Sequence, residues 1–200
     1  MKPLLRNLIL TVFLGFFVLV FSSLCFAEGE TVAADFDSGS ATNNLGGAIE
    51  VWLAGDGSDS TQFSKMSFVQ DDSTGKMDGQ AIKIDYDVDS ENPAYNGVRT
   101  DLNNFDTTGF KTLNFYIKGD AVAGFAKNLK VELIGENGRP SPAMASGITD
   151  QWQKISIPLT DFPMLQEGTK LQKFVVVFAD ITSDPKVGTI YLDNVFFSKS

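Results

Sequence analysis

The side chains that most often carry catalysis are scarce in this chain of 200 residues. There is no histidine, so Ser-His-Asp triads, Cys-His dyads and His-ligated zinc sites are excluded. The 25 acidic residues could supply the two carboxylates of a glycosidase, which need a defined separation across the scissile bond. In so acidic a chain some pair meets that spacing by chance, and nothing marks Asp101 and Glu132, for example, as a tuned acid and base. The sequence therefore predicts no enzyme.

Aromatic and polar side chains that alternate with core residues could instead bind a ligand. Aromatic rings pack on the apolar faces of sugar rings, and neighbouring polar groups hydrogen-bond the hydroxyls. The sequence predicts four residues of such a platform, namely Trp52, Tyr95, Arg99 and Tyr116. Plainer alternatives stay open, because Trp52 also suits a core position and an outward Tyr116 can simply cover a neighbour across the strands. Trp152, which precedes a strand, is expected to pack under a loop.

Apolar residues recur at every second position along most of the chain, which predicts that strands position these side chains. In residues 81–88, for example, Ile82 and Ile84 share a face opposite Lys83 and Asp85. Further strands are expected at 31–36, 48–53, 64–69, 95–102, 112–118, 129–133, 142–147, 154–159, 174–178 and 189–198, with one short helical turn within 159–165. The turn-rich connections predict an all-β sandwich of two antiparallel sheets.

The continuous apolar run at residues 174–178 differs from the alternating segments. It is too short to cross a membrane, and its β-branched residues favour a strand that is buried on both faces.

The start of the chain has the layout of a secretory signal. Lys2 and Arg6 precede an apolar run over residues 8–24, and small residues follow at the −3 and −1 positions of a cleavage site. We therefore expect residues 1–27 to be a signal peptide and residues 28–200 to form a single domain, secreted or periplasmic and not attached to a membrane. An uncleaved anchor is the alternative, because the apolar run approaches the length that spans a bilayer.

Charge and cysteine content narrow the partners of the mature domain. Loss of Lys2 and Arg6 with the signal lowers the net charge from −9 to −11. An acidic surface repels phosphate backbones, so no nucleic-acid partner is expected, and a glycan or a divalent cation fits better. Cys25 is the only cysteine and lies within the signal, so the mature domain has no disulfide or thiol chemistry.

Several motifs, in this order along the chain, resemble the galactose-binding-like jelly-roll domains. They are Asp35-Phe36-Asp37, Tyr95-Asn96-Gly97, the run from Leu113 to Gly119, the run from Ile148 to Phe162 with Trp152, and the run from Gly188 to Val195. The order is similar to that of family 11 carbohydrate-binding modules and their relatives, which include the complex I intermediate-associated domain. The resemblance covers nearly the whole mature chain and implies a two-sheet antiparallel jelly-roll β-sandwich, without specifying a sugar.

The resemblance also implies a structural Ca²⁺ ion, because relatives of this jelly roll often bind one between their first and last strands. The family's acid after the opening Phe matches Asp37, and its acid in the final strand matches Asp193. Calcium takes roughly six to eight oxygen ligands, and two carboxylates brought together would repel each other without a cation. The alternative is that Asp37 starts a turn and Asp193 accepts a hydrogen bond from a neighbouring backbone amide.

These expectations combine into a secreted, non-catalytic carbohydrate-binding protein that adsorbs a poly- or oligosaccharide on a sheet face. The alternative is an exported structural or assembly domain that binds another protein, because sugar-binding modules are mostly joined to a catalytic domain and none is visible in these 200 residues. A polysaccharide-active enzyme is a third option, which the absence of histidine disfavours.

Overall fold

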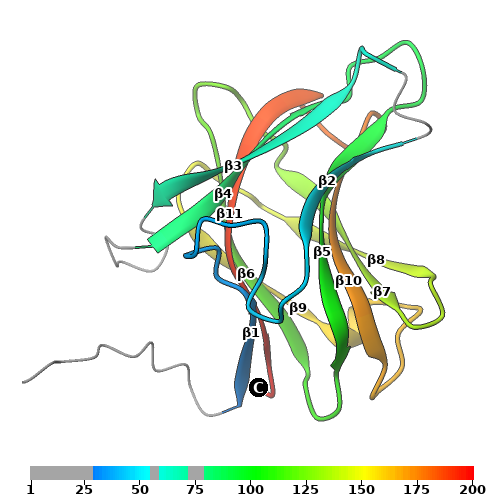
Figure 1. Ribbon diagram of the computed structural model, residues 1–200. Helices are drawn as coiled ribbons and strands as arrows, with labels where there is room; N and C mark the ends of the chain where they lie inside the picture. The colour runs from blue at the N-terminus through cyan, green and yellow to red at the C-terminus, as the bar shows by residue number, and fades with distance from the viewer. Residues whose placement is uncertain (1–28, 55–58, 72–78) are drawn as a thin grey trace, which may run out of the picture.

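Among the described residues, strands make up nearly all the regular structure. The computed structural model describes residues 29–54, 59–71 and 79–200 (Figure 1). The predicted signal peptide at 1–27 lies outside these residues. The strands are β1 (Glu30–Ala34), β2 (Ile49–Leu53), β3 (Phe63–Asp71), β4 (Gly79–Asp87), β5 (Tyr95–Asp106), β6 (Thr112–Gly119), β7 (Asn128–Gly135), β8 (Pro140–Ser146), β9 (Gln153–Pro158), β10 (Lys170–Ala179) and β11 (Val187–Ser198). The predicted helical turn is a 3₁₀ helix at Leu159–Asp161. Within the described ranges, no helix is both long and apolar enough to cross a membrane.

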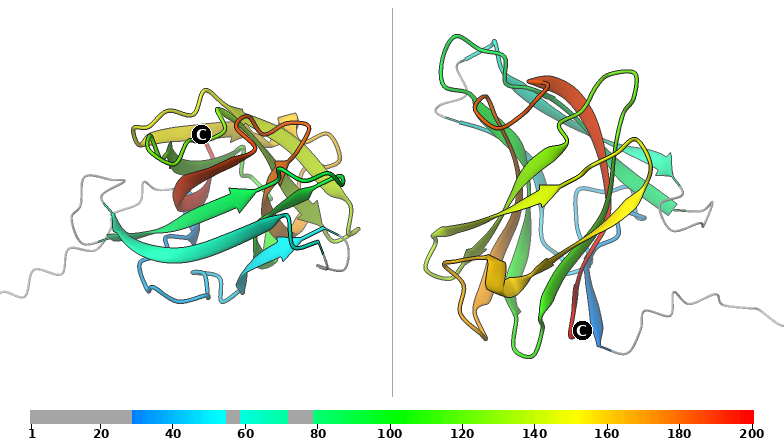
Figure 2. Two further views of the ribbon diagram at one scale, coloured as in Figure 1. Left: turned by 90° about the horizontal axis from the view of Figure 1, so that it is seen from above. Right: turned by 180° about the vertical axis from the view of Figure 1, so that it is seen from behind.

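The strands form two antiparallel sheets that face each other across one core (Figures 1 and 2). The five-stranded sheet has the order β2-β5-β10-β7-β8. The six-stranded sheet has the order β3-β4-β11-β6-β9, and β1 also pairs with β11. The all-β antiparallel sandwich predicted from the sequence is therefore confirmed.

The two-residue alternation produces this arrangement by filling the space between the sheets from both sides. Ile82 and Ile84 of β4 point inward and are fully buried, whereas Lys83 and Asp85 point out. β10 lies in the middle of its sheet, and residues 174–179 are all buried, as predicted for a strand covered on both faces.

Tyr86, near the end of β4, and Phe178, near the end of β10, join the two sheets across the core. Their rings stack with centroids 3.9 Å apart and an interplanar angle of 7°. The Tyr86 hydroxyl accepts a hydrogen bond from the Ala126 amide at 2.8 Å and donates one to the Pro185 carbonyl at 3.1 Å. Burial raises the pKa of Tyr86 to about 12, because the interior disfavours the phenolate. The buried Tyr86 hydroxyl therefore has its hydrogen bonds satisfied by backbone groups of two loops.

The first and last strands meet, as the sequence analysis expected. β1 pairs antiparallel with the end of β11, from Glu30 opposite Ser198 to Ala34 opposite Val195. The Lys199 amide also donates to the Gly29 carbonyl at 3.1 Å. Both ends of the described chain therefore lie at one end of the sandwich, at the bottom of Figure 1.

Candidate functional site

Two aromatic rings lie side by side on the outer face of the five-stranded sheet. Trp52 of β2 and Tyr95 of β5 have ring centroids 5.9 Å apart at an interplanar angle of 58°. Tyr95 is 48% exposed and Trp52 is partly buried. The geometry gives a tilted pair of rings that remains open to solvent on one side.

Gly97 makes room for this ring pair. It is the register partner of Trp52, and a Cβ atom at Gly97 would lie 3.1 Å from the indole nitrogen. The same Cβ atom would lie 1.9 Å from the carbonyl oxygen of Val176 in β10. Glycine is therefore required at position 97 for the Trp52 indole to pack against β5 and for β10 to pair closely with β5.

The indole N–H of Trp52 is buried, and no described residue accepts a hydrogen bond from it. A buried donor without a partner costs about 1–3 kcal/mol. Because this nitrogen is buried beside Gly97, a ligand would meet the apolar part of the indole ring.

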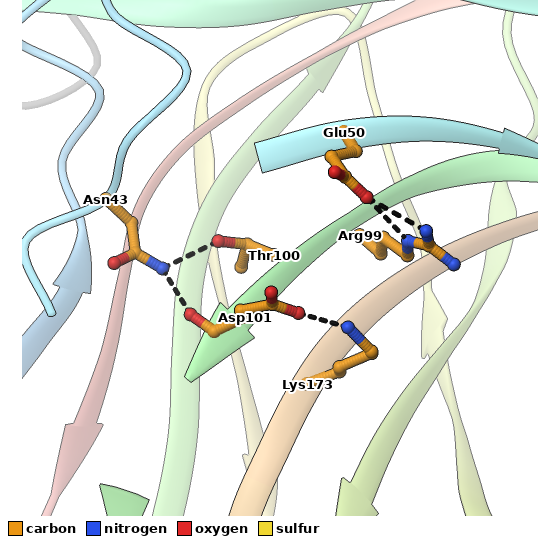
Figure 3. A network of polar contacts seen from close by, with 6 residues as sticks. All are labelled: Asn43, Glu50, Arg99, Thr100, Asp101 and Lys173. Carbon is orange, nitrogen blue, oxygen red and sulfur yellow. Dashed lines mark hydrogen bonds and ion pairs between the residues drawn. The ribbon is translucent and has the colours of Figure 1, made fainter. Parts of the chain in front are cut away.

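Charged residues flank the rings in three ion pairs. Arg99 donates to one carboxylate oxygen of Glu50 from Nε at 3.1 Å and from a terminal nitrogen at 2.9 Å (Figure 3). Lys173 contacts Asp101 on the neighbouring strand. The third pair, Lys130 with Glu132 on β7, has a separation of 3.1 Å. Exposed pairs of this kind contribute only about 0–1 kcal/mol to stability, so their main consequence is a face on which the charges cancel.

The floor between these groups consists of small or apolar residues. Val175 pairs with Arg99 and with Glu132, and Val177 pairs with Gly97. Both valines lie on the same side of the sheet as the ion pairs, and both are buried, with Val177 only 2% exposed. We call the outer surface formed by Trp52, Tyr95, the three ion pairs and this floor the Trp52 face.

A buried asparagine fastens the neighbouring loop to the Trp52 face. Asn43, which is 6% exposed, donates to Thr100 Oγ1 at 2.7 Å and to the Asp101 carbonyl at 2.6 Å (Figure 3). Its own side-chain oxygen accepts from the amides of Leu45 and Gly47 at 2.9 and 2.8 Å. The loop at 43–47 is thus held against β5, beside the Asp101–Lys173 pair.

The structure brings together three of the four predicted platform residues. Trp52, Tyr95 and Arg99 share the Trp52 face, but Tyr116 lies on β6 of the other sheet, in register with Asp193 and Lys154. Alternation predicted correctly that Tyr116 points outward, yet it cannot tell which sheet a strand joins. Tyr116 is therefore not part of the Trp52 face.

Glu50 and Lys173 belong to the Trp52 face but were not predicted from the sequence. Glu50 follows the buried Ile49, so its outward position could have been read from the alternation. Lys173 gave no such signal, because the register of β10 shifts between Leu171 and Lys173 and breaks the two-residue rhythm.

The described residues near Asp37 and Asp193 fit a calcium ion poorly. The β1–β11 pairing places both within a few residues of the Ala34–Val195 pair. However, Asp37 accepts a hydrogen bond from the Gln80 amide at 2.8 Å, and Asp193 accepts from the amide and side chain of Asn194 at 2.7 and 2.8 Å. Among the residues that the structure describes, no three acidic, histidine or cysteine side chains converge as metal ligands. Calcium stays a prediction.

Known structures share this architecture. Residues 44–199 match the family described as Carbohydrate binding domain 30. The family 11 carbohydrate-binding module of the cellulosomal cellulase Lic26A-Cel5E of Clostridium thermocellum is 17% identical, with a TM-score of 0.61 over 88% of this chain and 97% of that chain. A family 11 module from Clostridium thermocellum in complex with a β-1,3-1,4-mixed-linked tetrasaccharide is 16% identical, with a TM-score of 0.59 over 86% of this chain and 97% of that one. An exo-β-agarase structure is 11% identical, with a TM-score of 0.58 over 84% of this chain and 24% of that chain. Among curated proteins, none matches this sequence.

The structural neighbours are too distant in sequence to show more than the fold, and they confirm the jelly-roll sandwich. The family match covers most of the chain, including every strand from β2 onward. This protein therefore belongs to the Carbohydrate binding domain 30 family.

Proposed function

We propose that this protein is a non-catalytic carbohydrate-binding module that adsorbs an uncharged poly- or oligosaccharide on the Trp52 face. The single observation that carries the proposal is the open pair of rings, Trp52 and Tyr95, set on Gly97 beside charges that cancel. Family membership supports the class of ligand, and the geometry supports the location.

The rings and ion pairs have complementary parts in this binding mode. A sugar ring presents apolar C–H faces that pack on Trp52 and Tyr95, while its hydroxyls exchange hydrogen bonds with the groups of the Arg99–Glu50 pair. A charged sugar would meet both signs of charge at short range, so an uncharged one is favoured. Because the rings are already held by the sheet, little conformational entropy is lost on binding.

The test is retardation of the purified protein in native gels that contain a soluble polysaccharide. We choose mixed-linkage β-glucan as the first probe, because a solved neighbour was captured with a tetrasaccharide of that linkage. Agarose and the charged polymer alginate complete the panel. Trp52→Ala and Tyr95→Ala are each expected to weaken binding about tenfold, equal to about 1.4 kcal/mol. Ile181→Ala, at a site 86% exposed on a loop, is the matched control and should bind normally.

Four results would contradict the proposal. If Trp52→Ala and Tyr95→Ala both bound glycan as tightly as the wild-type protein, the binding site would have to lie elsewhere. Stronger retardation by alginate than by either uncharged polymer would overturn the ligand class. The appearance of new reducing ends would identify an enzyme, and a lack of any glycan binding with a co-purifying protein would favour an assembly domain.

Export completes the proposal and rests on the sequence. The structural calcium predicted from the sequence rests on the family resemblance alone, because the hydrogen bonds of Asp37 and Asp193 do not favour it. Signal processing before Glu28 would be tested by the N-terminal sequence of the exported protein. If Asp37 and Asp193 bind calcium, the ion stabilises the folded state by mass action, so the melting temperature should rise with added CaCl₂ and fall back with chelator. Asp193→Asn should abolish this rise. An identical melting temperature for the wild-type protein with calcium and with chelator would remove the ion from the proposal.

A further inference from the structure

A second set of rings lies on the opposite side of the molecule, on the outer face of the six-stranded sheet. Tyr191 of β11 is the register partner of Lys83 on β4 and of Lys118 on β6. Trp152 immediately precedes β9, the strand next to β6. We call these four residues the Trp152 row. The row crosses four adjacent strands, a width of about 14 Å at the usual strand spacing.

The two rings of the Trp152 row enclose a lysine side chain. The Lys118 ammonium lies 4.9 Å from the Trp152 ring centroid and 4.8 Å from that of Tyr191. The ring centroids are 6.5 Å apart at an interplanar angle of 66°. This spacing is close to that of the Trp52–Tyr95 pair, and all four residues of the row are partly exposed. The sequence analysis expected Trp152 under a loop, but the structure places it on this outer face.

A carboxylate fixes the second ring. The Tyr191 hydroxyl donates to Asp120 Oδ2 at 2.9 Å, and the amides of Val122 and Ala123 donate to Asp120 Oδ1 at 2.9 and 3.0 Å. The Ala123 and Val122 amides and then the Tyr191 hydroxyl lower the pKa of Asp120, so this acceptor stays ionised. Tyr191 is thereby held in one orientation before any ligand arrives.

The hydrophobic core does not depend on these rings. The neighbours of Tyr191 along β11, Ile190 and Leu192, point inward and are at most 1% exposed. Lys83 of the row lies 3.0 Å from Asp85, and its charge also helps to lower the pKa of Asp120, whereas the ammonium of Lys118 lies over the two rings. An uncharged, hydroxyl-rich ligand with apolar ring faces is the partner that this mixture of rings and polar groups complements.

We infer that the Trp152 row is a second binding site for an uncharged glycan, so that one domain holds two glycan segments on opposite faces. The inference shares the ligand class of the proposed function and is otherwise independent of the Trp52 face. It predicts that the protein cross-links polysaccharide chains, which a single-faced module cannot do.

The protein contains only two tryptophans, and one lies on each face, so they report on the two sites separately. Trp52→Phe leaves Trp152 as the reporter of the second site, and Trp152→Phe leaves Trp52 as the reporter of the first. Each variant would be titrated with the β-1,3-1,4-mixed-linked tetrasaccharide while tryptophan emission is recorded. We expect a saturable shift in emission from both variants. Tyr95→Ala added to Trp52→Phe should leave the Trp152 response unchanged.

The outcomes separate the two sites. A response from Trp52 with none from Trp152 would overturn the second site and leave the proposed function intact. A response from Trp152 alone would support the second site and overturn the Trp52 face as a binding site. No response from either tryptophan would overturn both sites. As a second readout, wild-type protein should raise the turbidity of a mixed-linkage β-glucan solution. Trp152→Ala should lose this effect yet remain retarded in the gel, and equal turbidity from wild type and Trp152→Ala would also contradict the second site.

Discussion

At the scale of single residues, hydrogen bonds to ionised carboxylates define the local conformation of the loops. Asp59, just before β3, accepts hydrogen bonds from the Thr61 hydroxyl at 2.5 Å, the Thr61 amide at 2.9 Å and the Ser90 hydroxyl at 3.0 Å. The Thr61 hydroxyl, followed by the Thr61 amide, lowers the pKa of Asp59 from 3.8 to about 2. The loop before β3 is thereby connected to the loop after β4.

Thr61→Ala is expected to raise the pKa of Asp59 toward 3.8, because it removes the strongest of these donors. The folded-state pKa lies below the unfolded one, so ionised Asp59 contributes stability above about pH 4, and this contribution is lost as the pH falls toward about 2. Carboxyl carbon shifts in an NMR titration would measure the pKa. Glu91→Gln, a nearby exposed substitution, is the control. The same pKa in wild type and Thr61→Ala would contradict this account.

At the scale of strands, the spacing between β5 and β10 determines whether the Trp52 face can form. At Gly97 the two strands leave no room for a side chain, since an added Cβ would lie 1.9 Å from the Val176 carbonyl oxygen and 3.1 Å from the indole nitrogen. Overpacking against a backbone atom cannot be relieved by turning a side chain, so the strands themselves must move. The ring pair and the packing of the central strands are therefore coupled through this glycine.

Gly97→Ala should lower the free energy of unfolding by about 1–3 kcal/mol and also weaken glycan binding, because the Trp52 ring is displaced. Urea unfolding and gel retardation would measure the two effects. Gly138→Ala is a matched control, because its Cβ would meet no atom within 4 Å and only its φ of +70° is strained. That control should lose stability but keep its affinity. Normal glycan binding by folded Gly97→Ala would show that Trp52 is not positioned in this way.

Most strands could be predicted because a sheet with one buried face imposes its two-residue period directly on the sequence. Sequence periodicity does not predict features that depend on which distant segments pair with each other. β10 was predicted only at 174–178, because the bulge near Gln172 hides its first half. Tyr116 was grouped with Trp52, because the pairing of β6 with β11 and β9 depends on contacts that one segment does not reveal. The Lys173–Asp101 pair joins residues 72 positions apart for the same reason.

At the scale of the whole molecule, the two outer faces differ from the remainder of an acidic protein. The net charge is −9, yet the charges on the Trp52 face cancel in three ion pairs, and Lys83 of the Trp152 row is paired with Asp85. Much of the excess negative charge lies instead in connecting segments, such as the loop after β4 with Asp89 and Glu91. Long-range repulsion between molecules is thereby combined with locally paired charges on these faces.

The pairing of β1 with the end of β11 has a consequence for linking this protein to another domain or to a solid support. Its two ends emerge together at one pole, and Tyr191 lies roughly 20 Å back along β11 from Ser198. A linker joined at either terminus would therefore leave the outer faces of both sheets accessible. If the domain is immobilised on a bead through its C-terminus, Trp52 and Trp152 should both remain exposed to solution.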